Sequence, residues 1–126
     1  MNIGNVGTGT LTIADSGVVA APNVVIANNA GSIGTLNIGA GAGNPAAAPG
    51  TLNVPSIAFG AGTGTINFNH TSASYVFAPA ISGNGTVNVL AGITTLTGAN
   101  TYSGATNVTL ARCEQACRIR SAQIRQ

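Results

Sequence analysis

The chain has 126 residues, of which 18 are glycine and only 5% are charged. An average soluble domain has about 25% charged residues, so a typical enzyme active site, with its several ionisable groups, is not expected here. Hydrophobic residues make up 44% of the chain, which argues against a disordered segment kept open by its charge. The length fits one domain or a piece of one. We therefore predict a chain with no catalytic residue, no cofactor and no metal site.

The positive net charge comes entirely from the C-terminal end of the chain. Residues 1–111 contain one charged side chain, Asp15, whereas residues 112–126 contain Glu114 and every arginine of the chain: Arg112, Arg118, Arg120 and Arg125. No basic groove with interleaved aromatic residues is apparent, so we expect no nucleic-acid partner. The composition divides the chain into a body over 1–111 and a different kind of sequence, a tail, over 112–126.

The body contains no segment typical of a membrane-spanning helix or a signal peptide. Its most apolar stretch, residues 18–27, contains Pro22 and is half the length of about 20 residues that a spanning helix needs. The N-terminal sequence MNIGNVGTG has neither the basic region nor the apolar region of a signal peptide. We expect the chain itself to carry neither element.

A repeated pentad, Gly-Thr-apolar-polar-apolar, predicts short strands in chain order. It occurs at residues 9–13, 34–38, 50–54, 64–68 and 85–89, with a degenerate copy at 94–97. Weaker alternations occur at residues 24–26, 57–59 and 108–110. A period of two places apolar residues on one face of each strand and Thr or Asn on the other. Glycine, alanine, asparagine and proline between the strands favour turns.

Near-identical strands favour stacking of equivalent units over a sandwich or an up-and-down barrel. We therefore predict an all-β fold, a parallel β-helix of about five coils, and leave the assignment of strands to sheets open. Matched Thr and Asn residues on the outside are expected to form hydrogen-bonded ladders. The predicted core consists of the apolar pentad positions and their neighbours: Leu11, Ile13, Val24, Ile26, Leu36, Ile38, Leu52, Val54, Ile57, Phe59, Ile66, Phe68, Val87, Val89 and Leu96.

The run TTLTGANTYSGAT, residues 94–106, resembles the autotransporter-associated β-strand repeat of bacterial autotransporter passenger domains. Together with the Gly-Thr-Leu-Asn-Ile units before it, the resemblance covers about residues 1–108. It implies a right-handed parallel β-helix, export through an outer-membrane barrel, and a location on the bacterial surface or outside the cell. The implied partners are the remainder of the parent passenger and its barrel, and the implied roles are adhesion, aggregation or carriage of another domain.

The tail departs from this resemblance, because no further Gly-Thr-Leu strand follows Val108. Two explanations stay open for residues 112–126: the product of a reading-frame shift, or a helical cap. A helix would place Cys113, Cys117 and Ile124 on one face. Two cysteines without further ligands do not make a zinc site, so we expect free thiols.

The few residues that could take part in catalysis or ligand binding all have a structural interpretation. His70 has no acid or cysteine near it in the sequence, and we expect an exposed loop histidine. Asp15, in Ala-Asp-Ser-Gly, is expected in a turn. The glycine runs 39–43 and 60–64 lack the lysine and spacing of a phosphate-binding loop, so they are also expected to be turns. Tyr75, Phe77 and Tyr102 are expected to pack in the core or at coil edges.

The resulting hypothesis is a non-catalytic structural segment of a surface passenger, without a small-molecule substrate. The alternative is an adhesin module that binds a host or surface glycan or protein through an Asn/Thr face containing Asn37, Asn53, Asn67 and Asn88. A polysaccharide-cleaving enzyme is disfavoured because the body lacks paired acids. With no lysine to protect them, the open ends of the coils are expected to self-associate.

Overall fold

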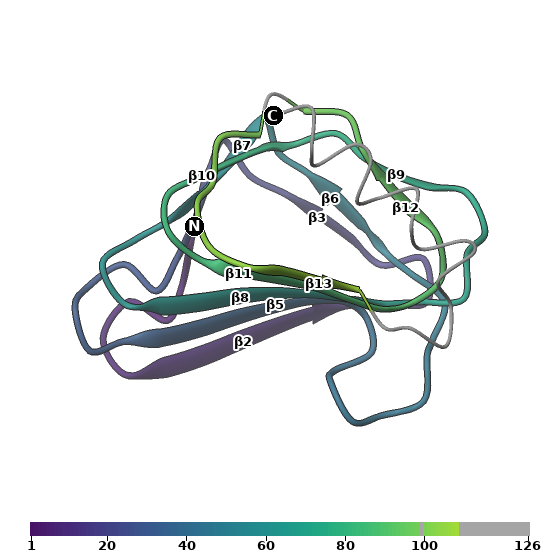
Figure 1. Cartoon of the computed structure of the whole chain (residues 1–126), viewed down its shortest axis with the longest axis horizontal. Coiled ribbons are helices and arrows are strands. Elements are labelled where there is room, and N and C mark those ends of the chain that lie inside the picture. The colour runs from purple at the N-terminus through teal and green to yellow at the C-terminus, as the bar shows by residue number, and fades with distance from the viewer. Residues whose placement is uncertain (99, 109–126) are drawn as a thin grey trace.

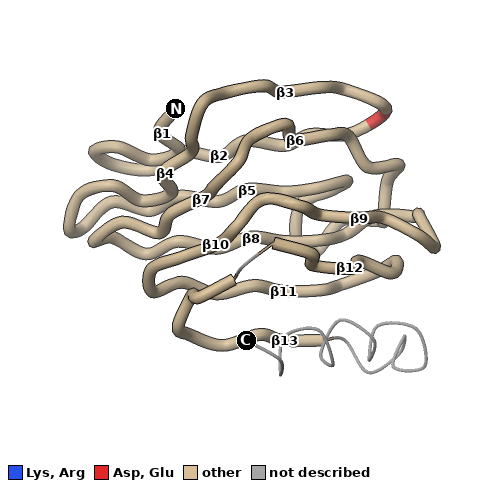
Figure 2. Tube along the Cα trace, turned by 90° about the horizontal axis from the view of Figure 1, so that it is seen from above, with Lys and Arg blue, Asp and Glu red and all other residues tan. Residues whose placement is uncertain are grey.

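The computed structural model describes residues 1–98 and 100–108, which form thirteen short strands and no helix. The predicted tail, with Cys113 and Cys117, lies outside the described residues. Successive strands follow a three-sided coil, and later coils stack on earlier ones along one axis (Figures 1 and 2). In Figure 1 each coil runs counterclockwise while later coils lie nearer the viewer, so the stack is right-handed. The predicted parallel β-helix is confirmed.

The largest face is a five-stranded parallel sheet in the order β13-β11-β8-β5-β2. Its strands are β2 (Thr8–Ile13), β5 (Ile33–Gly39), β8 (Thr63–Asn69), β11 (Thr86–Ala91) and β13 (Thr106–Val108). Four of the predicted pentads stack here in register, so that Leu11 pairs with Leu36 and Leu36 with Ile66. Thr106-Asn107-Val108 adds a fifth strand, paired with residues 87–89.

The other two faces are built from shorter strands. One is a four-stranded sheet in the order β1-β4-β7-β10, whose strands are β1 (Asn2–Ile3), β4 (Val24–Ile26), β7 (Ser56–Phe59) and β10 (Ala80–Ser82). The third face holds two separate pairs, β3-β6 and β12-β9, with strands β3 (Val18–Ala20), β6 (Thr51–Asn53), β9 (Tyr75–Phe77) and β12 (Thr94–Leu96). Parallel pairing joins every strand to the coil before or after it.

Two pentad copies do not occupy the position that their sequence suggests. The copies at 50–54 and 94–97 supply β6 and β12 of the third face, not strands of the five-stranded sheet. The reason is that Gly-Thr-apolar-polar-apolar specifies only an extended segment entered through a turn. All three faces need such segments, so the pentad predicts strands but not the face on which each strand lies.

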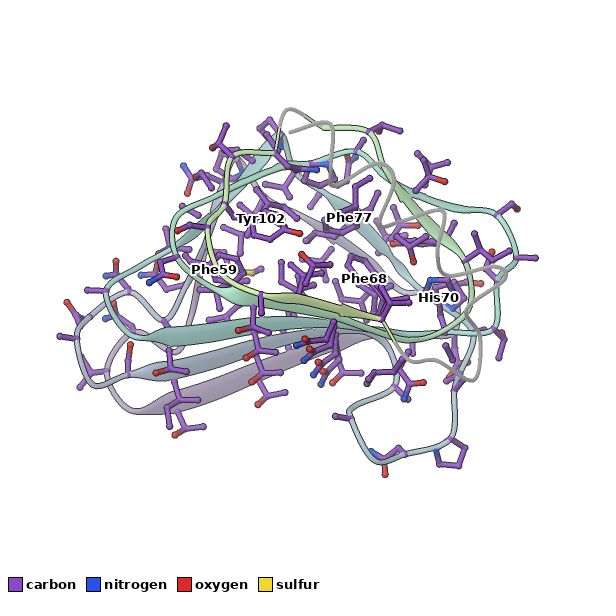
Figure 3. All side chains as sticks on the ribbon, viewed as in Figure 1. Phe59, Phe68, His70, Phe77 and Tyr102 are labelled. Carbon is purple, nitrogen blue, oxygen red and sulfur yellow. The ribbon has the colours of Figure 1, made fainter. Side chains whose placement is uncertain are left out.

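The apolar side chains fill a single interior that runs along the axis (Figure 3). Every predicted core residue is buried except Leu11, which is partly buried because β2 is an edge strand. The prediction missed several further buried residues: Ile3, Ala27, Ile81 and Ile93. Burying a Leu, Ile, Val or Phe side chain is worth about 1.5–3 kcal/mol, so these columns supply most of the driving force for stacking.

Within the segment that carries the family resemblance, residues 100–104 form a structural turn in place of a further strand beside β10. The Asn100 side chain, 3% exposed, accepts a hydrogen bond at Oδ1 from the backbone N–H of Ile81 at 2.9 Å. The Thr101 N–H then donates to the Ile81 carbonyl at 2.8 Å. Asn100 and Thr101 thus satisfy both main-chain groups of Ile81 that a neighbouring strand would otherwise pair with.

Tyr102 and Gly104 complete this turn. The Tyr102 ring packs edge-on against Phe59, with centroids 6.5 Å apart, and its hydroxyl lies 2.6 Å from Thr106 Oγ1. Gly104 has a φ of 115°, and a Cβ there would collide with the carbonyl oxygen of Gly85. Only glycine fits this combination of backbone angle and close approach. Nowhere in residues 1–98 and 100–108 is there a helix long and apolar enough to cross a membrane.

Candidate functional site

A buried polar cluster lies at the corner after β8, around His70 (Figure 3). Period two continues past the end of β8, so that His70 follows Ile66 and Phe68 on the inward face. Its side chain is 0% exposed. The expectation of an exposed loop histidine is therefore wrong. The alternation Ile66, Phe68, His70 was the signal in the sequence that could have predicted its burial.

Both ring nitrogens of His70 have a partner. Nδ1 accepts a hydrogen bond from the backbone N–H of Ser72 at 3.2 Å, and Nε2 lies 2.6 Å from Thr94 Oγ1. Because a backbone N–H can only donate, the proton of the neutral ring resides on Nε2, which donates to the Thr94 hydroxyl. Thr94 belongs to β12 of the next coil, so the histidine connects two successive coils.

The ring of His70 also belongs to an aromatic group. Its centroid lies 4.9 Å from that of Tyr75 and 6.4 Å from that of Phe68, while Phe68 packs edge-on against Phe77 at 5.0 Å. Burial lowers the pKa of His70 from its ordinary value of 6.5 and raises the pKa of the Tyr75 hydroxyl from 10.0. Both groups are therefore neutral at pH 7.

Hydrogen bonds at the same corner hold the long loop of residues 40–49 in place. The Ala47 N–H donates to the Asn69 carbonyl at 3.3 Å, and the Thr71 N–H donates to the Ala47 carbonyl at 3.2 Å. The Asn69 side chain donates to the carbonyls of Gly41 and Asn44, each at 2.9 Å. Three successive coils therefore meet at His70: the loop of the second, β8 of the third and β12 of the fourth.

A pocket of about 240 Å³ lies beside the histidine ring. Apart from His70, its lining consists of alanine, glycine, serine and threonine: Ala46, Thr71, Ser72, Ala73, Ala91 and Gly92. In the described part of the chain, no three His, Cys, Asp or Glu residues come together as metal ligands would.

A second pocket, of about 220 Å³, marks the interruption of the third face between β6 and β9. Leu52, Val76 and Phe77 are among its lining residues, and none of the lining side chains is charged. The Tyr75 hydroxyl spans the two coils near this point by donating to the Gly50 carbonyl at 2.8 Å. The cleft therefore offers apolar contact without a charged anchor.

The predicted polar ladder is present along the five-stranded sheet. Each asparagine donates from Nδ2 to the side-chain oxygen of the coil before it, at 3.1 Å for Asn37 to Thr12 and 2.9 Å for the later steps, which link Asn67 to Asn37, Asn88 to Asn67 and Asn107 to Asn88. Asn37 and Asn67 are only 5% and 4% exposed. Their amide groups are occupied by one another and are not displayed to a partner.

The four asparagines of the alternative adhesin hypothesis do not share one face, so the expectation of a single face is wrong. Asn37, Asn67 and Asn88 align on the five-stranded sheet, but Asn53 lies on β6 of the third face, where it is exposed. The separation follows from the pentad at 50–54, which looks equivalent in sequence and occupies another face.

The remaining candidates have the structural roles that we predicted. Asp15 lies exposed in the turn between β2 and β3 with a φ of 52°, and is the acidic residue coloured red on the trace in Figure 2. Of the two glycine runs, residues 40–43 follow β5 and residues 60–62 join β7 to β8 as expected, whereas Gly39, Thr63 and Gly64 belong to the strands themselves. Phe77 is buried, and Tyr75 and Tyr102 pack against the core while partly exposed.

Comparison with known proteins gives three partial matches. The chain is 40% identical over 117 residues to the uncharacterized lipoprotein YdeK of Escherichia coli (strain K12), covering 86% of this chain and 9% of that protein. It is 47% identical over 68 residues to the adhesin BmaC autotransporter of Brucella suis biovar 1 (strain 1330), covering 53% of this chain and 2% of that protein. The uncharacterized protein YuaQ of the same Escherichia coli strain is 37% identical over 111 residues, covering 83% of this chain and 8% of that protein.

These matches show that the chain is similar to a segment of an autotransporter adhesin and to a segment of a lipoprotein. The chain spans less than a tenth of the length of each relative. No family model matches it, and no solved structure matches it. The similarity is in keeping with a location at the cell surface or outside the cell.

Proposed function

We propose that this chain is a non-catalytic structural segment of a surface-displayed autotransporter passenger, built from autotransporter-associated β-strand repeats. The observation that carries the proposal is the parallel, in-register stacking of the pentads in the five-stranded sheet, with one register shift between Val89 and Ala91, an asparagine ladder on one face and apolar columns on the other. The partial identity to an autotransporter adhesin supports it.

The structure suits a protein that folds progressively as it leaves a membrane pore. Each coil pairs with its neighbour through parallel strands, and a coil cannot bury its apolar face without that neighbour. Folding of one coil therefore provides the template for the next, and the gain in free energy accrues coil by coil. In this proposal the partners of the segment are the other coils of its passenger and the outer-membrane barrel.

The test is surface display of a fusion that places the 126-residue chain between a signal peptide and an outer-membrane barrel. Leu36, 0% exposed, is replaced by Asp, and Val6, 81% exposed, is replaced by Asp as the matched control. We expect wild type and Val6→Asp to reach the surface alike, measured by antibody labelling of intact cells, and Leu36→Asp to be displayed poorly. Equal display of all three would contradict a role for the folded stack in export.

A second function, adhesion, is favoured by one observation, the match to an adhesin. Since the asparagine ladder is buried in part, we place the adhesive contact on exposed residues of the loop 40–49, which projects from the coils in Figure 1. Asn44→Ala and Pro45→Ala should then reduce binding of the displayed fusion to glycans or host matrix proteins without changing its display. Binding no greater than that of the barrel alone would contradict adhesion by this segment.

A further inference from the structure

We propose that His70 is a pH-sensitive latch, which keeps the corner after β8 closed at neutral pH and releases that corner, together with the loop 40–49, in acid. The inference concerns the contacts between coils and does not depend on the proposed function. The inference rests on three observations: a buried titratable group, a pocket beside that group, and the loop 40–49, which is hydrogen-bonded to residues adjacent to His70.

Protonation would add the second proton at Nδ1, because Nε2 already carries one and donates it to Thr94. Nδ1 lies 3.2 Å from the Ser72 nitrogen, whose N–H points at it. In the imidazolium form two donors would face each other, and the hydrogen bond between them would be lost. The closed corner therefore accommodates only the neutral ring.

Within residues 1–98 and 100–108, the surroundings of the ring offer no negative charge to compensate the added proton. Among the described groups packed against it, the titratable one is the Tyr75 hydroxyl, which is neutral because burial raises its pKa. The groups facing it from β12, the loop 40–49 and the β11–β12 turn are uncharged: Thr94, Ala46, Ala47, Ala91 and Gly92. Asp15 lies in the β2–β3 turn of the first coil, with its side chain exposed.

The pocket beside the ring provides a route to water. It is formed by small residues, and two of them, Thr71 and Ala73, are exposed. At Gly92 a Cβ would press on the ring of His70, so the glycine leaves space on this side. An imidazolium that turned into the pocket would give up Thr94 and Ser72. The adjacent backbone hydrogen bonds that join Ala47 to Asn69 and Thr71 would then be weakened.

The direction of the pH effect follows from the lowered pKa of the buried histidine. An open corner restores the ordinary pKa of 6.5, so the open form binds more protons as the pH falls below that value. The equilibrium constant that favours the closed corner has its full value above about pH 6.5. Below that pH it decreases about tenfold for each pH unit, until the pKa of the closed form is reached.

The test exploits the fact that the chain contains one histidine. The imidazole C–H resonance of His70 is followed by NMR in the full 126-residue chain from pH 8 to pH 4.5. Hydrogen exchange of the backbone amides is measured over the same range and corrected for its intrinsic pH dependence. We expect a midpoint below 6.5 and a loss of protection at Ser72, Thr71 and Ala47, by about tenfold per pH unit relative to the Ile38 amide in β5.

A midpoint at or above 6.5, or an unchanged protection ratio between Ser72 and Ile38, would overturn the proposal. His70→Asn gives a second measurement, because its side-chain oxygen can still accept from the Ser72 N–H but does not titrate in this range. The variant should lose the acid-induced opening although it is less stable at every pH. The same acid-induced opening in the variant would also overturn the proposal, and the wild-type titration decides the matter if the variant does not fold.

Discussion

Replacing Asn67 by Ala tests whether the asparagine ladder stabilises the stack of coils or contributes nothing to its stability. Asn67 stands in the middle of the ladder, donating to Asn37 Oδ1 at 2.9 Å and accepting from Asn88 Nδ2 at 2.9 Å. The replacement breaks both hydrogen bonds at a position that is 4% exposed. The matched control is Asn107→Ala, which breaks one similar bond at an exposed position.

The expected cost is derived from the groups that lose their partners. Asn37 is 5% exposed, so its side-chain oxygen would remain buried without a donor, at about 1–3 kcal/mol. The half-buried Asn88 amide can turn to water, and its loss is about 0.5–1.5 kcal/mol. We therefore expect Asn67→Ala to lower the free energy of unfolding by about 2–4 kcal/mol, and Asn107→Ala to lower it by less than about 1 kcal/mol.

The assay is urea unfolding followed by far-ultraviolet circular dichroism, since the chain has no tryptophan to serve as a fluorescent reporter. The transition midpoint should fall at an unchanged slope if stability alone is affected. Costs for the two variants that agree within about 0.5 kcal/mol would refute the reasoning. Such a result would mean that burial does not amplify the loss of a ladder bond.

Three further replacements test other parts of the stack, each measured by the same unfolding transition. Gly104→Ala should be strongly destabilising because the new Cβ would meet main-chain atoms. The control Gly43→Ala has open space around it and a φ of 85°, so it should lower the free energy of unfolding by about 1 kcal/mol from backbone strain alone. Equal costs for the two variants would contradict the close approach at Gly104. Phe68→Ala removes a side chain that is 0% exposed and should cost about 3–5 kcal/mol, and a cost below about 1 kcal/mol would argue against a packed core there. Asn100→Ala should cost about 1–3 kcal/mol and speed hydrogen exchange of the Ile81 amide; unchanged exchange would show that the side chain does not cap β10.

The core was largely predictable because burial follows from the period of a strand. Once residues 34–38 are read as extended, Leu36 and Ile38 must share one face and Asn37 the other. The same rule predicted the asparagine ladder. It did not predict that Asn37 is buried, where Gly41 of the loop 40–49 lies against the Asn37 amide.

His70 shows where sequence reasoning went wrong and why. We judged it by the lack of an acid or cysteine near it in the sequence and expected an exposed loop histidine. The strand phase was the better guide, because it places His70 on the inward face after Phe68. The partners that satisfy its ring, Ser72 and Thr94, come from the next turn and the next coil. No local sequence pattern predicts the contact between His70 and Thr94, which are 24 residues apart.

The sequence by itself determined that this protein is built from short strands with an apolar interior, because a period of two places the Leu, Ile and Val residues of each pentad on one face, and the near-identity of the pentads favoured parallel stacking. It also determined that residues 1–111 have almost no charge with which to do chemistry. Only the tertiary structure decided which face each strand occupies, which asparagines are buried and which coils meet at His70. The physical reason is that these outcomes depend on contacts between residues about 20–30 positions apart, and the lengths of the intervening turns set those contacts without any repeated pattern.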